Sequence, residues 1–456
     1  MLACKGENDT SNSSTKRNLK LNENDLPGIL KRGKIIVLAE NSATSYFIYK
    51  GKKLGFEYEI LKEFAEDLGV AIEVKLINDL TEMHEKLNAG EGDFIACNYT
   101  VTMDRKEDIE FTEPIIQSPQ VLIQRVETDP KLIKQHPLLT SQLELARKKI
   151  FVWEGSSYYQ RLINLQQEIG DTIFIRPTQS HEGVEELIEM VSNGQIDYTV
   201  CEKNVADINC RFFDNIDASL KISFDQKIAL GLNKKAPILK KKFNEWLNQF
   251  KKNELYAFIK KKYFTVPEKE VDENLPSVKI RKGMISPYDS YLQSEASKYN
   301  FEWHLLAAII YQESKFNPNA QGFGGAYGLM QFMPGTGPQY NVYPSSTAEQ
   351  QITGGMKYIN RLLKIWSKIP DPEQRYKFML ASYNAGPGHV IDAYKLAEKH
   401  GLNPKVWDNN VAEMVGNLGK REFYTDEVVK SGAFRGQRTV NYVASVMSKY
   451  HAFSGK

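Results

Sequence analysis

WHLLAAIIYQESKFNPNAQGFGGAYGLMQ, residues 303–331, is the stretch that decides the fold of the second half of this chain. Its first part is apolar, and three of its residues share one stripe of a predicted helix: Leu306, Ile309 and Ile310. Glu313 continues that stripe at helical spacing. The glycine-rich segment 322–328 follows at once, and such a segment lets the backbone approach a bound molecule closely.

Glu313 admits two interpretations. A carboxylate on an apolar helix face is costly unless it lines a cleft, where desolvation raises its pKa and keeps it protonated as an acid. An exposed glutamate at the end of a helix is the alternative, and it is the more frequent case for a glutamate taken alone. The motifs that follow in the sequence favour the acid.

Length and composition indicate a soluble chain of two or three domains. The 456 residues are 41% hydrophobic and 25% charged, as in ordinary globular proteins. The formal net charge of +2 gives no general case for binding nucleic acid. The longest apolar run, residues 305–310, is too short to span a bilayer. The four cysteines and seven histidines form no metal-ligand cluster, so the sequence predicts neither a metal site nor a cofactor.

The cysteines divide into two groups. Cys97, Cys201 and Cys210 are most simply small buried residues, and a Cys201–Cys210 disulfide is an alternative that spacing does not decide. Cys4 follows Leu-Ala and precedes a polar run, which resembles the end of a bacterial lipobox followed by a tether over residues 1–32. We expect lipidation of Cys4; coincidence is the alternative, because the basic and apolar parts of a signal do not precede it.

The first half of the chain alternates between short β-branched runs and amphipathic helical patterns. Strands are expected at residues 34–38, 70–77, 93–97, 149–153, 172–175, 197–201 and 227–232, and helices at 56–69, 81–89, 156–169, 183–192 and 236–262. This order predicts two α/β lobes of similar size before residue 220, each a mostly parallel sheet covered by helices. The lysines of the last helix are expected to form a solvated face.

Several of these segments together indicate a family. GKIIVLAEN, LGFEYEILKEFAEDLGV and LNAGEGDFIACNYTVTMDRKEDIEFTEPI lie within residues 33–125, and NGQIDYTVCEKNVA begins at residue 193. They resemble the family-3 periplasmic solute-binding proteins over residues 33–265. The resemblance implies two hinged lobes that close on a small ligand, here an amino acid or a small wall peptide.

The resemblance also implies ligand-binding residues. Arg105 stands in the T-x-x-R motif, whose guanidinium binds a ligand carboxylate. Glu202 stands where the family commonly has an aspartate that binds the ligand amine. Because glutamate is longer than aspartate, the resemblance does not decide whether the ligand is an amino acid. Phe47 is expected to cover the ligand. An ordinary surface arginine is the alternative for Arg105.

The second half is predicted to be all-helical. Residues 266–286 are charged, contain two prolines and lack periodicity, as a linker does. Helices are expected at 288–299, 303–312, 347–366, 372–384, 387–399, 404–415 and 438–450. The predicted fold class is therefore multidomain: an α/β two-lobed periplasmic-binding-protein-like domain at 33–265, then an all-α domain at 287–456.

Four short motifs occur in order in the helical half: ESKFNP from Glu313, GLMQ from Gly328, ASYNAG from Ala381 and TVNYV from Thr439. Together they resemble the catalytic domain of the soluble-type lytic murein transglycosylases, which has a lysozyme-like fold. Two departures are small. Glycine stands at 322 where serine is usual, and at 337 where alanine is usual.

The resemblance implies cleavage of the β-1,4 bond between N-acetylmuramic acid and N-acetylglucosamine, with Glu313 as the sole acid and base. An ordinary glycosidase needs a second carboxylate. Glu302 lies on the far side of the helix, and Glu349 and Asp392 belong to no shared motif. In the family, the N-acetyl carbonyl of the sugar assists instead. Glu313 then deprotonates the C6 hydroxyl, giving a 1,6-anhydro product without water.

The same motifs supply the predicted substrate-binding residues: Ser314, Gly328, Met330, Gln331, Tyr383, Asn384 and Tyr442. Met330 and Gln331 are expected near the N-acetyl group, and Tyr442 is expected to orient the acid. Core packing is the alternative for Met330 and Tyr442. An ordinary helix stop is the alternative for Tyr383 and Asn384.

In layout the chain resembles the F type of membrane-bound lytic murein transglycosylases. We therefore expect a peptidoglycan-cleaving enzyme of the bacterial envelope, at the periplasmic face and anchored as an outer-membrane lipoprotein, whose N-terminal domain senses a ligand. Three alternatives stay open: a lysozyme-like hydrolase, a non-catalytic receptor that binds solute and wall, and an enzyme whose first half is only a spacer.

Overall fold

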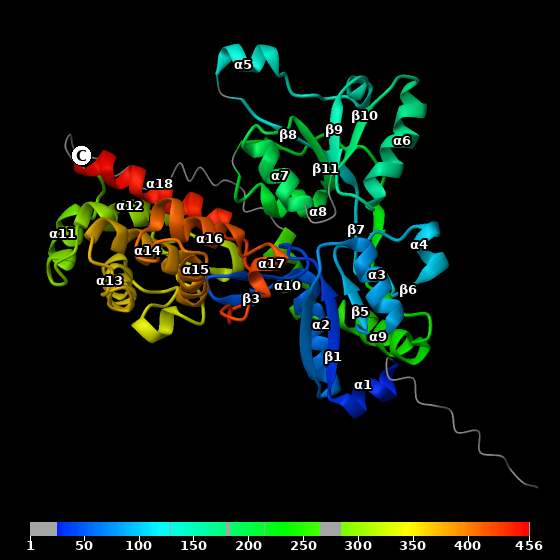
Figure 1. Cartoon of the computed structure of the whole chain (residues 1–456), viewed down its shortest axis with the longest axis horizontal. Helices are drawn as coiled ribbons and strands as arrows, with labels where there is room; N and C mark the ends of the chain where they lie inside the picture. Colours follow the sequence, from blue (N-terminus) through cyan, green and yellow to red (C-terminus); the bar gives the residue numbers. More distant parts are fainter. Residues whose placement is uncertain (1–24, 128, 179–182, 214, 265–283, 456) are drawn as a thin grey trace, which may run out of the picture.

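The computed structural model describes residues 25–127, 129–178, 183–213, 215–264 and 284–455. A two-lobed α/β part is followed by an all-helical part, and the two lie against each other (Figure 1). The predicted fold class is confirmed. Cys4 and nearly all of the predicted linker fall outside the described ranges, and within those ranges no helix is long and apolar enough to cross a bilayer.

The first lobe is built on a five-stranded sheet in the order β4-β1-β5-β14-β6. β1 runs parallel to β4 and β5, whereas β14 is antiparallel to β5 and β6. The strands are β1 (Lys34–Ala39), β4 (Ala71–Leu76), β5 (Phe94–Ala96), β6 (Glu110–Phe111) and β14 (Gly231–Leu232). The helices of this lobe are α1 (Leu26–Arg32), α2 (Phe56–Leu68), α3 (Leu80–Ala89), α4 (Met103–Asp108), α9 (Pro237–Phe250) and α10 (Glu254–Phe264).

The local sequence explains where the helices that follow β1 start and stop. Asp79 caps α3, because its carboxylate accepts from the backbone N–H groups of residues 81 and 82. Gly69 and Gly90 end α2 and α3 in the left-handed conformation, at φ 69° and 82°. These signals were readable in the sequence, so the predicted ends agree with the structure within two residues.

The second lobe has a five-stranded sheet in the order β10-β9-β11-β8-β12. Its strands are β8 (Gln120–Arg125), β9 (Lys149–Val152), β10 (Phe174–Pro177), β11 (Tyr198–Glu202) and β12 (Ile216–Asp217). Its helices are α5 (Pro130–Gln135), the 3₁₀ turn η1 (Gln142–Leu145), α6 (Ser157–Ile169), α7 (Val184–Ser192) and α8 (Lys203–Asn209). Parallel pairing of β9 with β10 and β11 follows from the intervening helices.

The expectation of two consecutive lobes before residue 220 is wrong. The chain leaves the first lobe through β7 (Ile116–Ser118) and returns through β13 (Gln226–Ile228), which pair antiparallel and join the lobes. The predicted strand 227–232 is therefore two strands in two sheets. The predicted helix 236–262 breaks between α9 and α10, where Lys252 and Asn253 donate to carbonyls three residues back. Long-range pairing, which local periodicity does not encode, decides the division of the strand. The helix break, in contrast, is a local turn.

A short hairpin was absent from the predicted elements. β2 (Phe47–Tyr49) and β3 (Lys52–Leu54) pair antiparallel, and Lys50 and Gly51 form a two-residue turn with φ 46° and 73°. Positive φ at both turn positions matches the strand twist of a tight hairpin. The hairpin projects from the first lobe to the helical domain, where β2 contacts α14 (Pro372–Ala385) (Figure 1).

The helical domain surrounds the apolar helix predicted from residues 303–312. Residues 305–310 of that helix, α12 (Trp303–Ser314), are fully buried, and α12 packs against α18 (Gln437–Ser454) and α11 (Asp289–Ser297). The other elements are η2 (Phe323–Gly325), η3 (Gly337–Tyr340), α13 (Ala348–Ile365), α14 (Pro372–Ala385), α15 (Pro387–Lys399), η4 (Trp407–Val411), α16 (Ala412–Asn417) and α17 (Arg421–Tyr424). The predicted helix 404–415 is only partly helical, because Asp408 and Asn409 leave helical geometry.

Candidate active site

Glu313 lies in the last turn of α12 and is almost buried, with its side chain 7% exposed. The helix stops sharply just beyond it, since Lys315 and Phe316 take positive φ values of 52° and 67°. This end turns the chain into the glycine-rich segment, which forms one wall of the space in front of the carboxylate. Glu313 is not the exposed residue of the alternative interpretation.

Tyr442, on α18, holds one oxygen of this carboxylate. Its hydroxyl donates to Oε1 of Glu313 at 2.7 Å. Burial, and then the charge of Glu313, raise the pKa of Tyr442 well above its usual value, so the hydroxyl keeps its proton. Tyr442 therefore contacts the Glu313 carboxylate directly and lines the cavity in front of it, besides packing against the core.

The glycine-rich segment is fixed by side chains of the predicted motifs. The hydroxyl of Ser314 donates to the carbonyl of Leu329 at 2.8 Å. The amide of Gln331 donates to the carbonyls of Ala320 and Gly328, at 3.1 and 2.9 Å, while its own backbone has a φ of 48°. These bonds tie the segment to the end of α12 and close it into a loop.

At the two positions where glycine replaces the usual residue of the family, 322 and 337, the absent side chain makes room for a neighbouring side chain. A Cβ at Gly322 would lie 1.9 Å from Oε1 of Gln331, and one at Gly337 would lie 2.0 Å from the hydroxyl of Tyr327. Real Cβ atoms do not approach other heavy atoms so closely. The absent side chains therefore let Gln331 fold into the loop and let Tyr327 donate to the carbonyl of Val342 at 2.8 Å.

The remaining motif residues divide between the site and the core. The Oδ1 of Asn384 accepts from the hydroxyl of Thr439 at 2.7 Å, and both residues line the cavity in front of Glu313. Tyr383 donates to the carbonyl of Met330, which ties α14 to the loop. Met330 itself is fully buried against Gly355 of α13, the core-packing position.

Lys50, at the tip of the β2–β3 hairpin, enters this site from the first lobe. Its Nζ lies 2.9 Å from Oε2 of Glu313 and 2.9 Å from the carbonyl oxygen of Gln331. It also lies 5.4 Å from the ring centre of Tyr383, within cation–π range. Burial opposes the charge on Lys50, but Glu313 beside it holds the pKa of Lys50 above its usual value. Sequence reasoning missed this residue, since a lysine beside a turn glycine is an ordinary surface pattern.

Aromatic rings hold the hairpin in place. Phe323, in the glycine-rich segment, lies 5.6 Å from Phe47, 5.7 Å from Tyr49 and 5.6 Å from Tyr263, measured between ring centres. Phe323 of the helical domain is thus packed into the core of the first lobe. Phe47, predicted to cover a ligand, lies at this domain junction instead.

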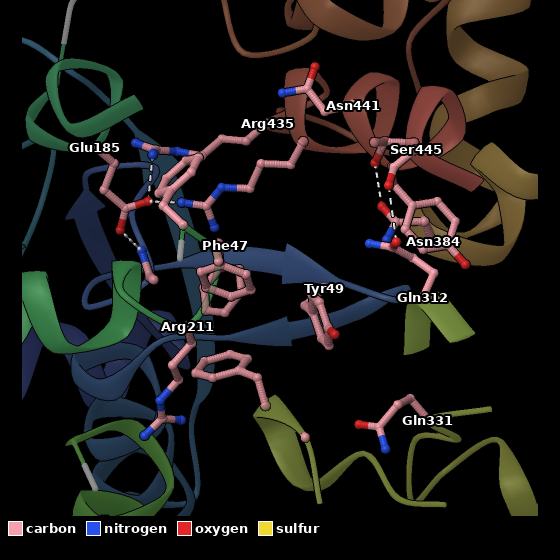
Figure 2. A pocket seen from close by; sticks show the side chains of 18 of the residues that line it. Phe47, Tyr49, Glu185, Arg211, Gln312, Gln331, Asn384, Arg435, Asn441 and Ser445 are labelled. Atoms are coloured by element: carbon pink, nitrogen blue, oxygen red, sulfur yellow. Dashed lines mark hydrogen bonds and ion pairs between the residues drawn. The ribbon is translucent and has the colours of Figure 1, made fainter. Parts of the chain in front are cut away.

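A cavity of about 740 Å³ lies between the α/β part and the helical domain. Glu313, Gln331, Asn384 and Tyr442 line it, and Figure 2 shows Gln331 and Asn384 across from Glu185 and Arg435. Among the described residues, Glu185 is the only other carboxylate in its lining.

Glu185, at the start of α7, connects all three parts of the molecule. Its Oε1 accepts from the backbone N–H of Ala43 in the first lobe at 2.7 Å. Its Oε2 accepts from Arg435 at 2.5 Å and from Arg438 at 3.0 Å, both in the helical domain. Although burial opposes its ionisation, the two arginines hold the pKa of Glu185 below its usual value. Glu185 is thus a paired anion and is not free to act as a second catalytic carboxylate.

Arg105 and Glu202 meet at a second place, the contact between the two lobes. Arg105 donates to the carbonyls of Thr100 and Gly155, at 2.8 and 3.0 Å, and stacks on Tyr99 with 4.0 Å to the ring centre. Glu202 is buried and accepts from the hydroxyls of Thr100, at 2.8 Å, and of Tyr158. The structure thus brings these two predicted ligand residues together through Thr100.

Two further buried carboxylates lie at this contact, and sequence reasoning missed both. Burial raises the pKa of Glu40 to about 8 and that of Glu57 to about 7. Within the described chain, Oε1 of each has no hydrogen-bond partner. Their positions, at the end of β1 and the start of α2, are the signal that could have found them, because ligands bind near the carboxyl ends of such strands.

Comparison with known proteins matches both halves. The family model of bacterial extracellular solute-binding proteins, family 3, covers residues 34–266, and that of the transglycosylase SLT domain covers residues 290–404. A membrane-bound lytic murein transglycosylase F of Desulfosudis oleivorans is 34% identical over 94% of this chain and 91% of its own length. The chain belongs to this family.

Other members of the transglycosylase F family are also similar to most of this chain. The protein of Saccharophagus degradans is 32% identical over 92% of this chain and 82% of its own length, and that of Shewanella woodyi is 31% identical over 87% and 80%. Among solved structures, an ancestral amino-acid-binding protein covers 52% of this chain and 98% of its own, at 22% identity and a TM-score of 0.45.

In this member of the family, the three cysteines of the described ranges, Cys97, Cys201 and Cys210, are free thiols. The alternative of a Cys201–Cys210 disulfide therefore does not hold in this structure.

Proposed function

We propose that the chain is a lytic transglycosylase that cleaves the N-acetylmuramic acid–N-acetylglucosamine bond of peptidoglycan and leaves 1,6-anhydro ends. One arrangement carries the proposal: the buried Glu313, oriented by Tyr442, faces a cavity whose only other carboxylate among the described residues is already paired with two arginines. Without a second free carboxylate, neither a covalent glycosyl-enzyme on another residue nor a water activated by a carboxylate other than Glu313 is available.

The chemistry then follows from one acid and the substrate. Glu313 gives its proton to the glycosidic oxygen as the bond to C1 breaks, and the N-acetyl carbonyl oxygen of the muramic acid closes onto C1. The C6 hydroxyl next attacks C1 and displaces that oxygen, while the Glu313 carboxylate takes the hydroxyl proton. The acid is regenerated and no water is consumed. Tyr442 serves both steps by holding Oε1, and Gln331 and Asn384 provide polar contacts for the sugar.

The conformation described here is a restrained one. Both oxygens of Glu313 accept hydrogen bonds, from Tyr442 and from the Lys50 ammonium. In this arrangement the ammonium occupies the side of the carboxylate that has to face the glycosidic oxygen. Lys50 also fills the place that the scissile sugar needs. The hairpin must withdraw before catalysis.

Control of that withdrawal is assigned to the N-terminal domain. The hairpin belongs to the first lobe, and Glu185 in the second lobe fastens both lobes to the helical domain. A small ligand between the lobes, an amino acid or a wall peptide held by Arg105 and Glu202, changes how the lobes pack. A ligand that binds one packing of the lobes more tightly than the other would shift the enzyme between the restrained and the released state.

The site of action is proposed to be the bacterial envelope, at the periplasmic face of the outer membrane. The names of the relatives and the Leu-Ala-Cys sequence at Cys4 support a lipid anchor. Metabolic labelling with a fatty acid tests it. Label in the wild type but not in Cys4→Ala, together with release of the variant into the soluble fraction, is the expected result; label retained in Cys4→Ala would refute the anchor.

Product analysis tests the activity. Purified peptidoglycan is digested with wild type, Lys50→Ala and Lys50→Ala/Glu313→Gln, and the fragments are identified by mass spectrometry. We expect anhydro ends from the first two and none from the third. Glu302→Gln in the Lys50→Ala background is the matched control, because Glu302 is exposed beside the same helix. Reducing ends would identify a hydrolase, and the absence of products from every variant would favour a non-catalytic receptor.

A further inference from the structure

We propose that Arg435 and Arg438 form a subsite for the carboxylates of the peptide stem that muramic acid carries, and that Glu185 occupies this subsite in the restrained conformation. The inference rests on the proposed function, because it concerns the same substrate. It assigns a role in substrate recognition to two arginines outside the four motifs.

The two guanidinium groups converge on one anion. Nη1 of Arg435 and Nη2 of Arg438 lie 2.5 and 3.0 Å from the same Oε2 of Glu185. Nη2 of Arg435 also reaches Glu186 at 3.4 Å. Both carboxylates come from α7 of the second lobe, whereas both arginines belong to the helical domain. The helical domain therefore presents a paired cationic site that another domain fills.

The arginines lie beside the reacting bond. Arg438 and Tyr442 are four residues apart on α18, which is about one helical turn and about 6 Å along the axis. Tyr442 contacts Glu313 directly, and Arg435, Arg438 and Glu313 line the same cavity. Figure 2 shows Arg435 and Asn441 on the α18 side of this cavity.

The chemistry of the substrate places carboxylates within reach of this subsite. The anhydro product requires the muramic acid to sit against Glu313, and its stem leaves from C3 through a lactyl ether. The stem carries several free carboxylates along a chain longer than one helical turn. Two guanidinium groups that converge on one oxygen are suited to such a group, because charge-assisted hydrogen bonds to a carboxylate are short and strong.

Withdrawal of the second lobe makes the subsite available. The Arg435 and Arg438 side chains are only 15% and 22% exposed, so leaving both charges without an anion is costly. Nε of Arg435 is buried and has no acceptor among the described residues, which leaves one further donor for a larger anion. A stem carboxylate that replaces Glu185 neutralises the positive charges of the two arginines. The same contact holds the enzyme in the released state.

The test uses the full chain in a released background, Lys50→Ala/Glu185→Gln, with and without Arg435→Gln/Arg438→Gln. Each protein is given stem-bearing glycan strands and the same strands after amidase has removed the stems, and kcat/KM is measured from anhydro ends. We expect the released background to prefer stem-bearing strands by roughly tenfold or more, as charge-assisted hydrogen bonds imply. The double arginine variant should bring that ratio close to one.

Two controls separate recognition from loss of charge or of fold. Arg361→Gln removes an exposed arginine of the same domain and should keep the preference. Arg435→Lys/Arg438→Lys keeps both charges but not the paired donors, and should give an intermediate ratio. An unchanged preference in the double glutamine variant, with anhydro ends still formed, would overturn the subsite and leave the arginines as a docking contact. Absence of anhydro ends in all variants would instead overturn the proposed function.

Discussion

Nζ of Lys50 lies 2.9 Å from Oε2 of Glu313, although the two residues are 263 positions apart in the chain. The contact joins the tip of a hairpin in the first α/β lobe to the end of the central helix of the other domain. Both side chains are nearly buried, at 8% and 7% exposure, so the pair is shielded from solvent and salt. An ammonium ion thus stands beside the carboxylate that we propose as the acid for the glycosidic oxygen.

Lys50→Ala should release the enzyme. Removing the ammonium frees Oε2 of Glu313 and opens the sugar position, so anhydro ends should form roughly tenfold faster without added ligand, the effect of about 1.4 kcal/mol in a two-state equilibrium. The measurement is the initial rate on purified peptidoglycan. Lys53→Ala, an exposed lysine of the same hairpin, is the control and should behave as wild type. Equal rates for all three proteins would show that the hairpin does not restrain catalysis.

Tyr442→Phe should slow the chemical step more than it weakens binding. It removes one hydrogen bond to a charged group, which is worth about 1.5–3 kcal/mol and so lowers kcat by roughly ten- to a hundredfold. Steady-state kinetics in the Lys50→Ala background measure this effect. Tyr376→Phe removes a half-buried hydroxyl elsewhere in the same domain and should leave kcat unchanged. A rise in KM with an unchanged kcat would contradict an orienting role for Tyr442.

The contact between the lobes should weaken as pH rises. The pKa of Glu40 is raised from 4.5 to about 8, mainly by burial, so the folded state binds this proton more tightly than the unfolded chain. The associated stability is complete below about pH 4.5 and is lost as pH rises through about 8, at roughly 1.4 kcal/mol per pKa unit. The wild-type melting temperature should therefore fall between pH 5 and pH 9.

Glu40→Gln should flatten that fall, because the amide imitates the protonated acid at every pH. Part of the slope should persist, since Glu57, with its pKa raised to about 7, titrates nearby. Glu85→Gln, which changes an exposed glutamate of the same lobe, should retain the full slope. Identical pH profiles for Glu40→Gln and wild type would refute the assignment of this proton to Glu40.

Gly337→Ala should destabilise the helical domain. The added Cβ would lie 2.0 Å from the hydroxyl of Tyr327 and 2.6 Å from the carbonyl oxygen of Val342, so it would break the hydrogen bond between them. Overpacking of this kind costs about 1–3 kcal/mol. Thermal unfolding measures the loss, and Gly416→Ala, where the nearest atom is a flexible side chain at 3.2 Å, is the control. Equal melting temperatures for Gly337→Ala and wild type would contradict the steric role.

The sequence by itself determined the two architectures, the family and the catalytic glutamate that we propose. Helical periodicity placed Glu313 at the end of an apolar stripe, and four ordered motifs marked Tyr442 and Asn384 as its neighbours. The fold and the family are confirmed, and the structure brings Tyr442 to Glu313, whereas the catalytic role of Glu313 stays a proposal. Helical periodicity could place Glu313 on its helix because it is a local property of the chain.

Only the tertiary structure decided what faces Glu313. Lys50 and Glu185 carry no sequence signal, because each is an ordinary charged residue until two domains dock and bury it. The same holds for Phe47, which packs against Phe323 at the domain junction, and for the first lobe, which the chain completes only after building the second. Contacts between residues distant in the chain depend on how whole lobes pack, and no local pattern encodes that packing.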